Sequence, residues 1–473
     1  FKSDIKFIYG NGGLLNTYPL FAELNLNLLN KNGMTGLIMP SGFFSDDTLS
    51  PLFRFCLENN FIEKIIDFEN NKKIFQDVHG QFRFCISILN KAKRKEGFVA
   101  QFYLNNPIQI GNTESLIDIK SQDLRMFNPN NLVCPSFKSK NEFFLNKKLF
   151  KFGVLKDEND RSNHTEIHRM INMSSDSNLL QNDFYEKSLP LYESKLISCY
   201  DHRFATFEAV SRVEMNKGNA ILVEPELKIN SNYTIKPRYY CDANILIQRN
   251  INWEWNYKWY LVYRVISAST NERTSIASII PSSAVSYSSY IIFIKDIYDV
   301  ILQISIMNSM PFDFVARSKV NLNFPPVILQ QTPSIKQSQI NYENLLVIII
   351  RVIELVYTAW DIKAFADDVW KEADEELKEI IKNQWEENKA ETGGHTWEPP
   401  EWAEIDPEGC PLPPFKWHED RRARLKAELD AYYAKLYQLT DEELRYILDP
   451  KDVYGEDFPR SEERRVGKEG RSR

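Results

Sequence analysis

The sequence predicts an α/β domain first, then an α+β domain, and finally a helical C-terminal module. Three observations predict this order. Short apolar runs alternate with helix-periodic segments over residues 14–90, short apolar pieces divided by Asn, Ser and Pro fill residues 98–340, and residues 343–390 show the apolar period of helices. A chain of 473 residues is long enough for about three domains.

Helix and strand signals alternate in the first domain. Residues 34–39 are a short apolar run of the kind found in buried parallel strands, and the apolar runs 61–68 and 82–89 read as two paired strands. Before them, a helix that stops at Asn32-Gly33 is predicted by four apolar residues at helical spacing, Tyr18, Phe21, Leu24 and Leu28. The domain is therefore expected to be half of a doubly wound sheet that ends in two paired strands.

Charge and proline delimit the later segments. Residues 91–96 are a charged break, and residues 392–417 form an acidic, Pro-rich loop. Thr440-Asp441-Glu442-Glu443 is a capping box for a last short helix. Residues 460–473 resemble the translation of a sequencing adapter, so we expect them to be a non-native tail.

Charge is spread unevenly along the chain. The formal net charge is −7, yet residues 351–473 hold 20 Lys and Arg against 31 Asp and Glu, whereas residues 1–350 hold 38 against 34. This distribution excludes indiscriminate nucleic-acid binding but allows a basic groove in the first part. Six scattered cysteines without a CxxC pair indicate reduced thiols, and no apolar stretch is long enough to span a bilayer. We expect a soluble, cytoplasmic protein.

Several sequence blocks occur together in one known family. Residues 16–21 read Asn-Thr-Tyr-Pro-Leu-Phe, and residues 32–43 read Asn-Gly-Met-Thr-Gly-Leu-Ile-Met-Pro-Ser-Gly-Phe. Asp-Phe-Glu-Asn follows at 67–70 and Lys-Ile-Phe-Gln-Asp-Val-His at 73–79. In this order the blocks resemble amino-methyltransferases that act on adenine in DNA.

Later blocks resemble the type IIG restriction–modification branch of these enzymes. They are Leu-Tyr-Glu-Ser-Lys at 191–195, Tyr-Asp-His-Arg at 200–203, Ser-Thr-Asn-Glu-Arg-Thr at 269–274, Met-Asn-Ser at 307–309, Phe-Asp-Phe-Val-Ala-Arg at 312–317 and Tyr-Ile-Leu-Asp-Pro at 446–450. The resemblance implies a site-specific DNA adenine methyltransferase of a restriction–modification or phage-defence system, with S-adenosylmethionine as cofactor. It implies double-stranded DNA as partner, with restriction or defence subunits as further partners and no membrane.

The resemblance also divides the chain by function. Residues 1–95 are expected to complete the catalytic domain, as the second half of a Rossmann-like methyltransferase sheet. Residues 96–340 are expected to recognise the DNA target, and residues 341–459 to form the helical module. The Gly-rich turn that holds the cofactor and the catalytic Asn-Pro-Pro-aromatic motif are not found in this sequence. We therefore expect a C-terminal fragment that contains no catalytic residue and is inactive alone.

The resemblance assigns two residues to the expected pocket. A methyltransferase extrudes its target base, and aromatic side chains replace the lost stacking. Phe75 matches the family's aromatic residue in the loop between the last two strands, although Ile74 and Phe75 could equally be buried core residues. Tyr18 is the expected residue on the cofactor side of the pocket, and core packing is its alternative.

Five polar residues are expected to contact DNA: Lys195, His202, Arg203, Asn271 and Arg273. Lys and Arg neutralise phosphates, and Arg and Asn read base edges. The alternative for Arg203 and Arg273 is an ion pair with a neighbour such as Asp201, Glu208 or Glu272. The aromatic cluster at 253–260 is expected to be mainly core, with a base-stacking platform as the alternative.

Other chemistries are not favoured by the sequence. His164 and His168 are one i,i+4 pair in a polar loop without a third ligand, so no metal site is expected. Two other functions remain open: a non-catalytic DNA specificity subunit, and the back part of a combined methyltransferase–endonuclease. A structural scaffold is a third alternative.

Overall fold

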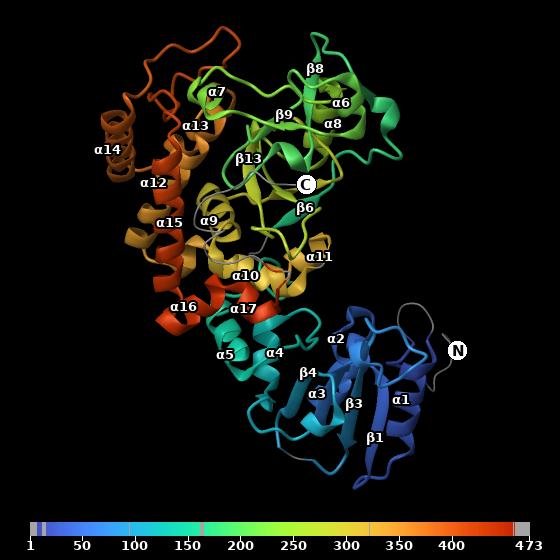
Figure 1. Cartoon of the computed structure of the whole chain (residues 1–473). Helices are drawn as coiled ribbons and strands as arrows, with labels where there is room; N and C mark the ends of the chain where they lie inside the picture. The colour runs from blue at the N-terminus through green and yellow to red at the C-terminus, as the bar shows by residue number, and fades with distance from the viewer. Residues whose placement is uncertain are drawn as a thin grey trace. The chain divides into compact units, whose positions relative to one another are not determined.

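The computed structural model describes residues 7–11, 16–93, 95–160, 165–320, 322–456 and 458. It divides into two compact units, Phe1–Arg161 and Ser162–Arg473, which we call unit 1 and unit 2 (Figure 1). This division differs from the expected boundaries at residues 95 and 340. The suspected adapter tail at 460–473 and His164 lie outside the described residues.

Unit 1 is built on one five-stranded sheet in the order β1-β3-β2-β4-β5. Strand β3 is antiparallel to both β1 and β2, whereas β2 and β4 run parallel and β5 is antiparallel to β4. The strands are β1 (Met34–Pro40), β2 (Ile62–Glu69), β3 (Arg83–Asn90), β4 (Phe98–Leu104) and β5 (Ile117–Ile119). The expected pairing of the last two strands of the first domain, β2 and β3, is confirmed. The sheet continues past residue 95 because β4 follows the charged break and pairs with β2.

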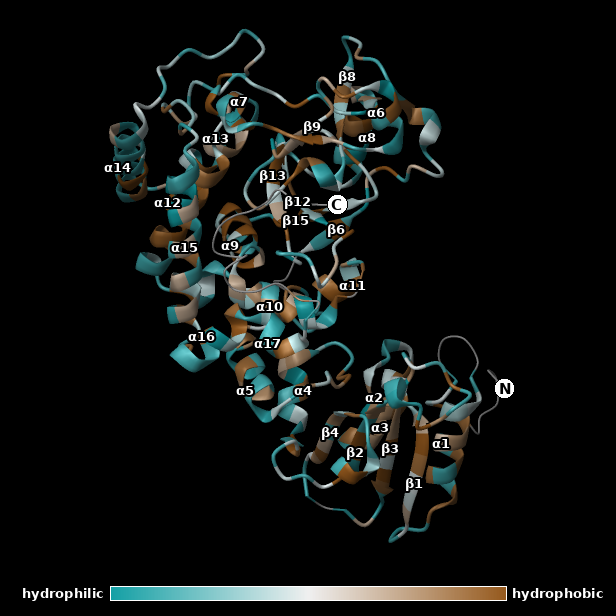
Figure 2. Cartoon of the chain, viewed as in Figure 1, coloured by the Kyte–Doolittle hydropathy of each residue, from teal (hydrophilic) through white to brown (hydrophobic). Residues whose placement is uncertain are grey.

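Helices accompany this sheet: α1 (Thr17–Leu28), α2 (Gly42–Ser45), α3 (Ser50–Glu58), α4 (Ser121–Phe127) and α5 (Lys140–Leu149). Helix α3 buries Leu52, Phe53 and Cys56 in the core, where the hydrophobic strands of the sheet also lie (Figure 2). The amphipathic spacing thus fixes which face of α3 is buried. Asp46 caps the 3₁₀ turn before α3 through the Thr48 backbone N–H at 2.8 Å.

An apolar surface remains exposed on unit 1. Helix α1 forms where predicted, but its periodic residues Phe21, Leu24 and Leu28 face outward, while Leu20, Ala22 and Leu26 are buried. The expectation that residues 34–39 are a buried strand is wrong in part, since Met34 and Ile38 are exposed. Among the described residues, β1 pairs on one side only, with β3.

Unit 2 carries two four-stranded sheets and a two-stranded ribbon. The first sheet has the order β14-β8-β11-β7 and the second β13-β12-β15-β6, and β10 pairs with β9. The strands are β6 (Glu166–His168), β7 (Leu180–Gln181), β8 (Ser188–Tyr192), β9 (Ala205–Thr206), β10 (Ile221–Leu222), β11 (Tyr240–Asp242), β12 (Trp259–Arg264), β13 (Ala277–Pro281), β14 (Ala284–Val285) and β15 (Ser289–Phe293). Trp255, Trp259 and Tyr260 are buried, so the aromatic cluster around β12 is core, as expected.

Helices make up the rest of unit 2. In chain order they are α6 (Arg212–Lys217), α7 (Pro225–Ile229), α8 (Ala243–Asn252), α9 (Ile297–Met307), α10 (Met310–Lys319), α11 (Pro326–Leu329), α12 (Tyr342–Val356), α13 (Lys363–Glu372), α14 (Glu375–Thr392), α15 (Glu419–Leu436), α16 (Asp441–Leu448) and α17 (Pro450–Tyr454). Thr440 caps α16 in the predicted capping box. Helices α9 and α12 pack together across the expected boundary at residue 340, so that boundary does not separate two compact bodies.

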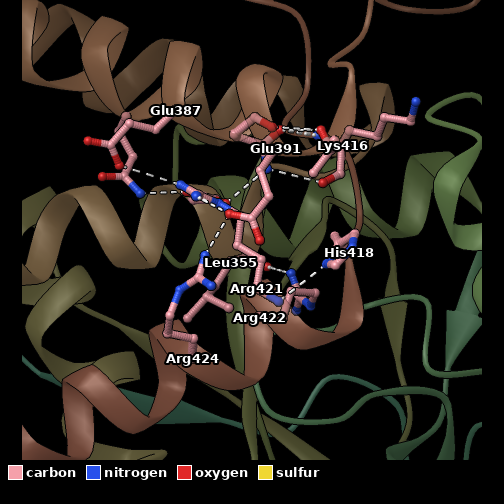
Figure 3. Close-up of polar contacts among 12 residues, drawn as sticks. Leu355, Glu387, Glu391, Lys416, His418, Arg421, Arg422 and Arg424 are labelled. Atoms are coloured by element: carbon pink, nitrogen blue, oxygen red, sulfur yellow. Dashed lines mark hydrogen bonds and ion pairs between the residues drawn. The ribbon is translucent and has the colours of Figure 1, made fainter.

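A buried ionic network joins α12, α14 and α15 (Figure 3). Arg421 on α15 donates from Nε to Glu354 Oε1 at 2.5 Å and from Nη1 to Glu391 Oε2 at 2.9 Å. Arg422, its neighbour, donates to the carbonyls of Leu355 and Tyr200 at 2.8 and 3.2 Å. The helical module is therefore tied by hydrogen bonds to the segment around residue 200.

Candidate functional site

The candidate site lies at one end of the unit 1 sheet, where the parallel strands β1 and β2 both finish. Pro40 on β1 and Phe68 on β2 are both in register with Phe84, on the strand between them. Neighbouring strands lie about 4.8 Å apart, so the ends of β1 and β2 are separated by about 10 Å. In open α/β sheets, ligands bind outside the carboxyl ends of parallel strands.

Phe75 lies in the loop between β2 and β3, at the level of these strand ends. Its ring packs edge-on against Phe84 with centroids 4.8 Å apart, and Phe84 stacks on Phe68 at 5.1 Å. The Phe75 side chain is 40% exposed, whereas Ile74 packs against the core cluster around Phe68. The alternative that both residues are buried core is therefore wrong for Phe75, whose side chain is partly open to solvent.

Asn70 fixes the backbone of this loop. Its side chain is fully buried, and its Nδ2 donates to the carbonyls of Phe75 and Val78, each at 2.9 Å. Its Oδ1 accepts from the Phe75 backbone N–H at 2.9 Å. Lys73 has a left-handed backbone with φ 55°, and its Nζ donates to the Val78 carbonyl at 2.9 Å. The loop that presents Phe75 is thus closed by side chains from its own sequence.

Tyr18 lies beside the turn that follows β1. Its hydroxyl is 3.0 Å from the position that a Cβ on Gly42 would take, so a side chain at Gly42 would displace it. Burial, together with the nearby Asp46 carboxylate, raises the pKa of Tyr18 to about 12, so the phenol stays protonated at neutral pH. Tyr18 is half-buried and at the same sheet edge as Phe75.

Asp67 lies on the other face of β2, at the same end of the sheet, and was not predicted as a site residue from the sequence. Its Oδ1 accepts from the Ser41 hydroxyl at 2.5 Å, and its Oδ2 contacts Arg83 and accepts from the Tyr103 backbone N–H at 3.3 Å. One buried carboxylate therefore links the turn after β1 to β3 and β4. The available signal was an acidic residue inside the otherwise apolar end of a strand, since a buried charge must be paired.

Two of the five expected DNA contacts are buried in unit 2, which corrects their assignment. Arg203 has no exposed surface and donates to four backbone carbonyls, those of Lys228, Asn230, Tyr233 and Thr358, at 3.0–3.2 Å. His202 is 2% exposed, and its Nε2 lies 2.9 Å from Asp361 Oδ1. Neither side chain can reach a DNA groove from these positions. Backbone carbonyls from distant loops take the place of the ion pair that was considered for Arg203.

The other three expected DNA contacts are more accessible. Arg273 pairs with Asp430 at 3.3 Å and lines a cavity of about 470 Å³. Lys195 is partly exposed and donates to the Gly218 carbonyl at 2.6 Å. The Asn271 side chain is exposed, while its backbone carbonyl accepts from Arg317. Lys195 and Asn271 thus lie at the surface of unit 2, although Lys195 Nζ is also 3.7 Å from Glu193 Oε1.

Two general properties bear on the site. Within the ranges that the structure describes, no three His, Cys, Asp or Glu side chains come together as metal ligands would. None of the helices in those ranges has both the length and the apolar character needed to cross a bilayer.

Comparison with known protein families finds a match to the first part of the chain. Residues 2–75 match the family described as Eco57I restriction-modification methylase. The match ends at Phe75 and includes α1, β1 and β2. It confirms the resemblance at a coarse level, as that of a restriction–modification methylase, over this segment. No curated protein matches the chain.

Solved structures give weaker similarities. The chain is similar to the type IIG restriction endonuclease BpuSI, with 10% identity, a TM-score of 0.29, and coverage of 92% of this chain and 50% of that one. The corresponding values for the type IIL restriction-modification enzyme MmeI in complex with DNA are 11%, 0.35, 91% and 50%. For a DrdV–DNA complex they are 8%, 0.30, 75% and 41%. The chain spans about half the length of the first two structures. TM-scores this low do not support an assignment of function.

Proposed function

We propose that this chain is the target-binding part of a DNA methyltransferase that modifies the N6 amine of adenine. The observation that carries this proposal is the exposed ring of Phe75, on a fixed loop at the end of the parallel strands and at the edge of the methylase-family segment. We assign the whole enzyme to a restriction–modification or phage-defence system of the type IIG kind, acting on double-stranded DNA in the cytoplasm.

The chemistry of base modification explains the exposed aromatic ring. The exocyclic amine of adenine cannot be reached inside a duplex, so the base must leave the stack at a cost of a few kcal/mol. Stacking on a protein aromatic returns about 1–3 kcal/mol per base. Phe75 offers one free face or edge, and its contact with Phe84 holds the ring in place. The role of this chain is therefore to receive and orient the extruded base.

We place the methyl-transfer step itself on residues outside this chain. S-adenosylmethionine supplies an electrophilic methyl group when bound, and the amine must be held by hydrogen-bond acceptors for attack. Tyr18 contributes a neutral phenol beside the turn after β1, on the side that we assign to the cofactor. The Asp67 contacts keep that turn and strand β3 in fixed relation.

The exposed apolar surface of unit 1 supports the view that a further part of the enzyme covers it. Phe21 and Leu28 on α1 are 60% and 77% exposed, and Ile38 on β1 is 64% exposed. Large exposed apolar side chains beside an unpaired strand edge are unfavourable in water and favour pairing with another segment. We propose that the cofactor-binding half of the sheet, with the catalytic Asn-Pro-Pro motif, packs on this surface.

Unit 2 then provides target recognition. We propose that Lys195 exchanges its contacts with Gly218 and Glu193 for a backbone phosphate, and that the Asn271 amide, with its donor and acceptor, reads an adenine edge. Arg273 is held in its ion pair with Asp430 and would need to exchange that partner for DNA. We keep Lys195, Asn271 and Arg273 as proposed DNA contacts and withdraw His202 and Arg203.

The direct test is modification profiling of DNA from a host that lacks adenine methylation and expresses the complete enzyme. Single-molecule sequencing should find N6-methyladenine at one recognition sequence, with the Phe75→Ala enzyme as the matched control. N4-methylcytosine would overturn the base assignment. Absence of any modified base, with intact sequence-specific binding, would instead favour the DNA specificity subunit.

A further inference from the structure

The strongest unused feature of the site is the buried amide of Asn70. A side-chain amide has two N–H donors and one carbonyl oxygen. Here the nitrogen donates to the carbonyls of Phe75 and Val78, and the oxygen accepts the Phe75 N–H. Both backbone polar groups of Phe75 are therefore bonded to the same side chain. This arrangement fixes the backbone of Phe75 and hence the direction in which its ring leaves the loop.

Local geometry shows that the loop is held against its own preference. Lys73 has φ 55°, a left-handed conformation that is unfavourable for a non-glycine residue. Its backbone N–H donates to the Asn70 carbonyl at 2.8 Å, and its side chain reaches the Val78 carbonyl. Such a conformation persists only where the surrounding contacts determine it. Asn70 supplies these contacts from both its backbone and its side chain.

No other side chain of similar size reproduces the Asn70 contacts. Aspartate would keep the acceptor for the Phe75 N–H but would place a carboxylate oxygen against two carbonyls. Alanine would remove the acceptor of the Phe75 N–H and one of the two donors to each of the Phe75 and Val78 carbonyls, whose other donors are the Val78 N–H and Lys73 Nζ. Asn71, the next residue, is exposed, and its Nδ2 donates to Glu69 Oε2 at 3.2 Å. It is therefore a matched control within the same loop.

We propose that Asn70 is a positioning residue for the target base, acting through Phe75. It does not touch the base itself. It holds the loop so that the Phe75 ring rests on Phe84 and presents its free side at the sheet edge. This inference rests on the proposed function for its consequence in methyl transfer, but the hold on the loop can be measured without any activity.

The first experiment measures the loop directly in the 473-residue chain. Hydrogen–deuterium exchange of peptides covering residues 71–79 should be at least ten-fold faster in Asn70→Ala than in the wild type, with unchanged exchange in β2 and β3. Asn71→Ala should match the wild type, and Asn70→Asp should lie between. Equal exchange in Asn70→Ala and the wild type would overturn the proposed hold on the loop.

The second experiment is a double-mutant cycle in the complete enzyme. Asn70→Ala should lower the kcat/KM of methyl transfer about ten-fold or more and leave the DNA Kd within two-fold. In the Phe75→Ala background, Asn70→Ala should have less than a two-fold effect, because the ring through which it acts is already absent. A merely structural role would instead lower activity equally in both backgrounds, and that result would overturn the inference.

The two experiments also separate the inference from the proposed function. If the complete enzyme methylates no adenine, or if Phe75→Ala is fully active, the proposed function fails while the exchange result still decides the role of Asn70 in the loop. If Phe75→Ala is impaired and Asn70→Ala acts independently of it, the proposed function stands and the positioning role fails.

Discussion

The loop at 70–82 and the segment at 191–203 are each held by a buried polar side chain, but they differ in which of the expected contact residues stay exposed. Both are stretches that the family resemblance singled out, and in both a buried polar side chain binds backbone groups around it. Asn70 closes its loop and leaves Phe75 40% exposed, whereas Arg203 and His202 are themselves inside unit 2. A polar residue in such a block can therefore be the part that holds the backbone, while an exposed neighbour carries the contact with the ligand.

This difference changes which residues of unit 2 are worth testing on DNA. Arg203 donates hydrogen bonds to carbonyls of residues 228–233 and of Thr358. It therefore links the segment before β9 to the helical module. Lys195, eight positions earlier, keeps a side chain that is 38% exposed. The comparison therefore predicts that stability and DNA affinity respond to different residues of the same segment.

The largest expected effect is on stability. Arg203→Ala should destabilise unit 2 by about 3–5 kcal/mol, because it removes a buried charge and leaves several carbonyls without their donor. The measurement is the unfolding transition of unit 2 in chemical denaturant. Arg203→Lys, which keeps the charge but not the planar fork, should recover part of the loss. A normal unfolding transition with weakened DNA binding would show instead that Arg203 contacts DNA.

Phe75→Ala should have the next largest effect, and on catalysis. Loss of a stacking partner worth about 1–3 kcal/mol should lower methyl transfer by the complete enzyme about 5- to 150-fold. The melting temperature should change little, because the ring is partly exposed. Phe75→Trp keeps an aromatic face and should retain most activity. Similar turnover in the alanine and tryptophan variants would remove the stacking role.

The two units should also respond to pH in opposite directions. In unit 1, burial raises the pKa of Glu142 to about 7 from an ordinary value of 4.5, so its contribution to stability falls as pH rises from about 4.5 to about 7. In unit 2, burial of Asp201 opposes its charge, but Lys228 and Arg422 outweigh burial and lower its pKa. Its contribution is present above about pH 4 and is lost in more acidic solution.

Calorimetry of the two unfolding transitions tests this contrast. Glu142→Gln should raise the melting temperature of unit 1 at pH 8 and change it little at pH 4, because the amide keeps an acceptor for the Lys138 N–H without a charge. Asp201→Asn should lower the melting temperature of unit 2 at pH 7 and have a smaller effect near pH 2. A pH-independent gain from Glu142→Gln would contradict the raised pKa.

The remaining expected effects are on DNA affinity. Lys195→Ala should weaken binding for all sequences alike and reduce the slope of log K against log salt by about 1. Asn271→Ala should cost about 1–3 kcal/mol at one base position only. Binding titrations at several salt concentrations, with target and mismatched duplexes, separate the two. Loss of specificity in Lys195→Ala, with an unchanged salt slope, would reverse the assigned roles.

The sequence alone predicted local elements well, because their signals are local. The capping box at Thr440 and the helix at Thr17–Leu28 are where the pattern placed them. The periodic face of that helix is exposed, however, since periodicity shows that a face is apolar and not what covers it. Strand positions were also predicted, but the order that puts β3 between β1 and β2 depends on pairing over long distances.

The candidate site was also predicted only in part, because its contacts over long distances leave no local signal in the sequence. Phe75 and Tyr18 were predicted from the family resemblance, and both lie at the same end of the sheet. His202 and Arg203 were misassigned because their partners, Asp361 and Thr358, are more than 150 positions away in sequence. Asn70 lies in one of the family blocks, but its role could not be predicted, since an asparagine that ends a strand is also a common loop residue.

The most direct test of the central claim is photocross-linking of the complete enzyme to DNA that carries 5-iodouracil in place of the target adenine. We expect one cross-linked peptide in unit 1 that contains Phe75, and its loss in Phe75→Ala while binding persists. A cross-link of the target base to unit 2, or an unchanged yield in Phe75→Ala, would contradict it.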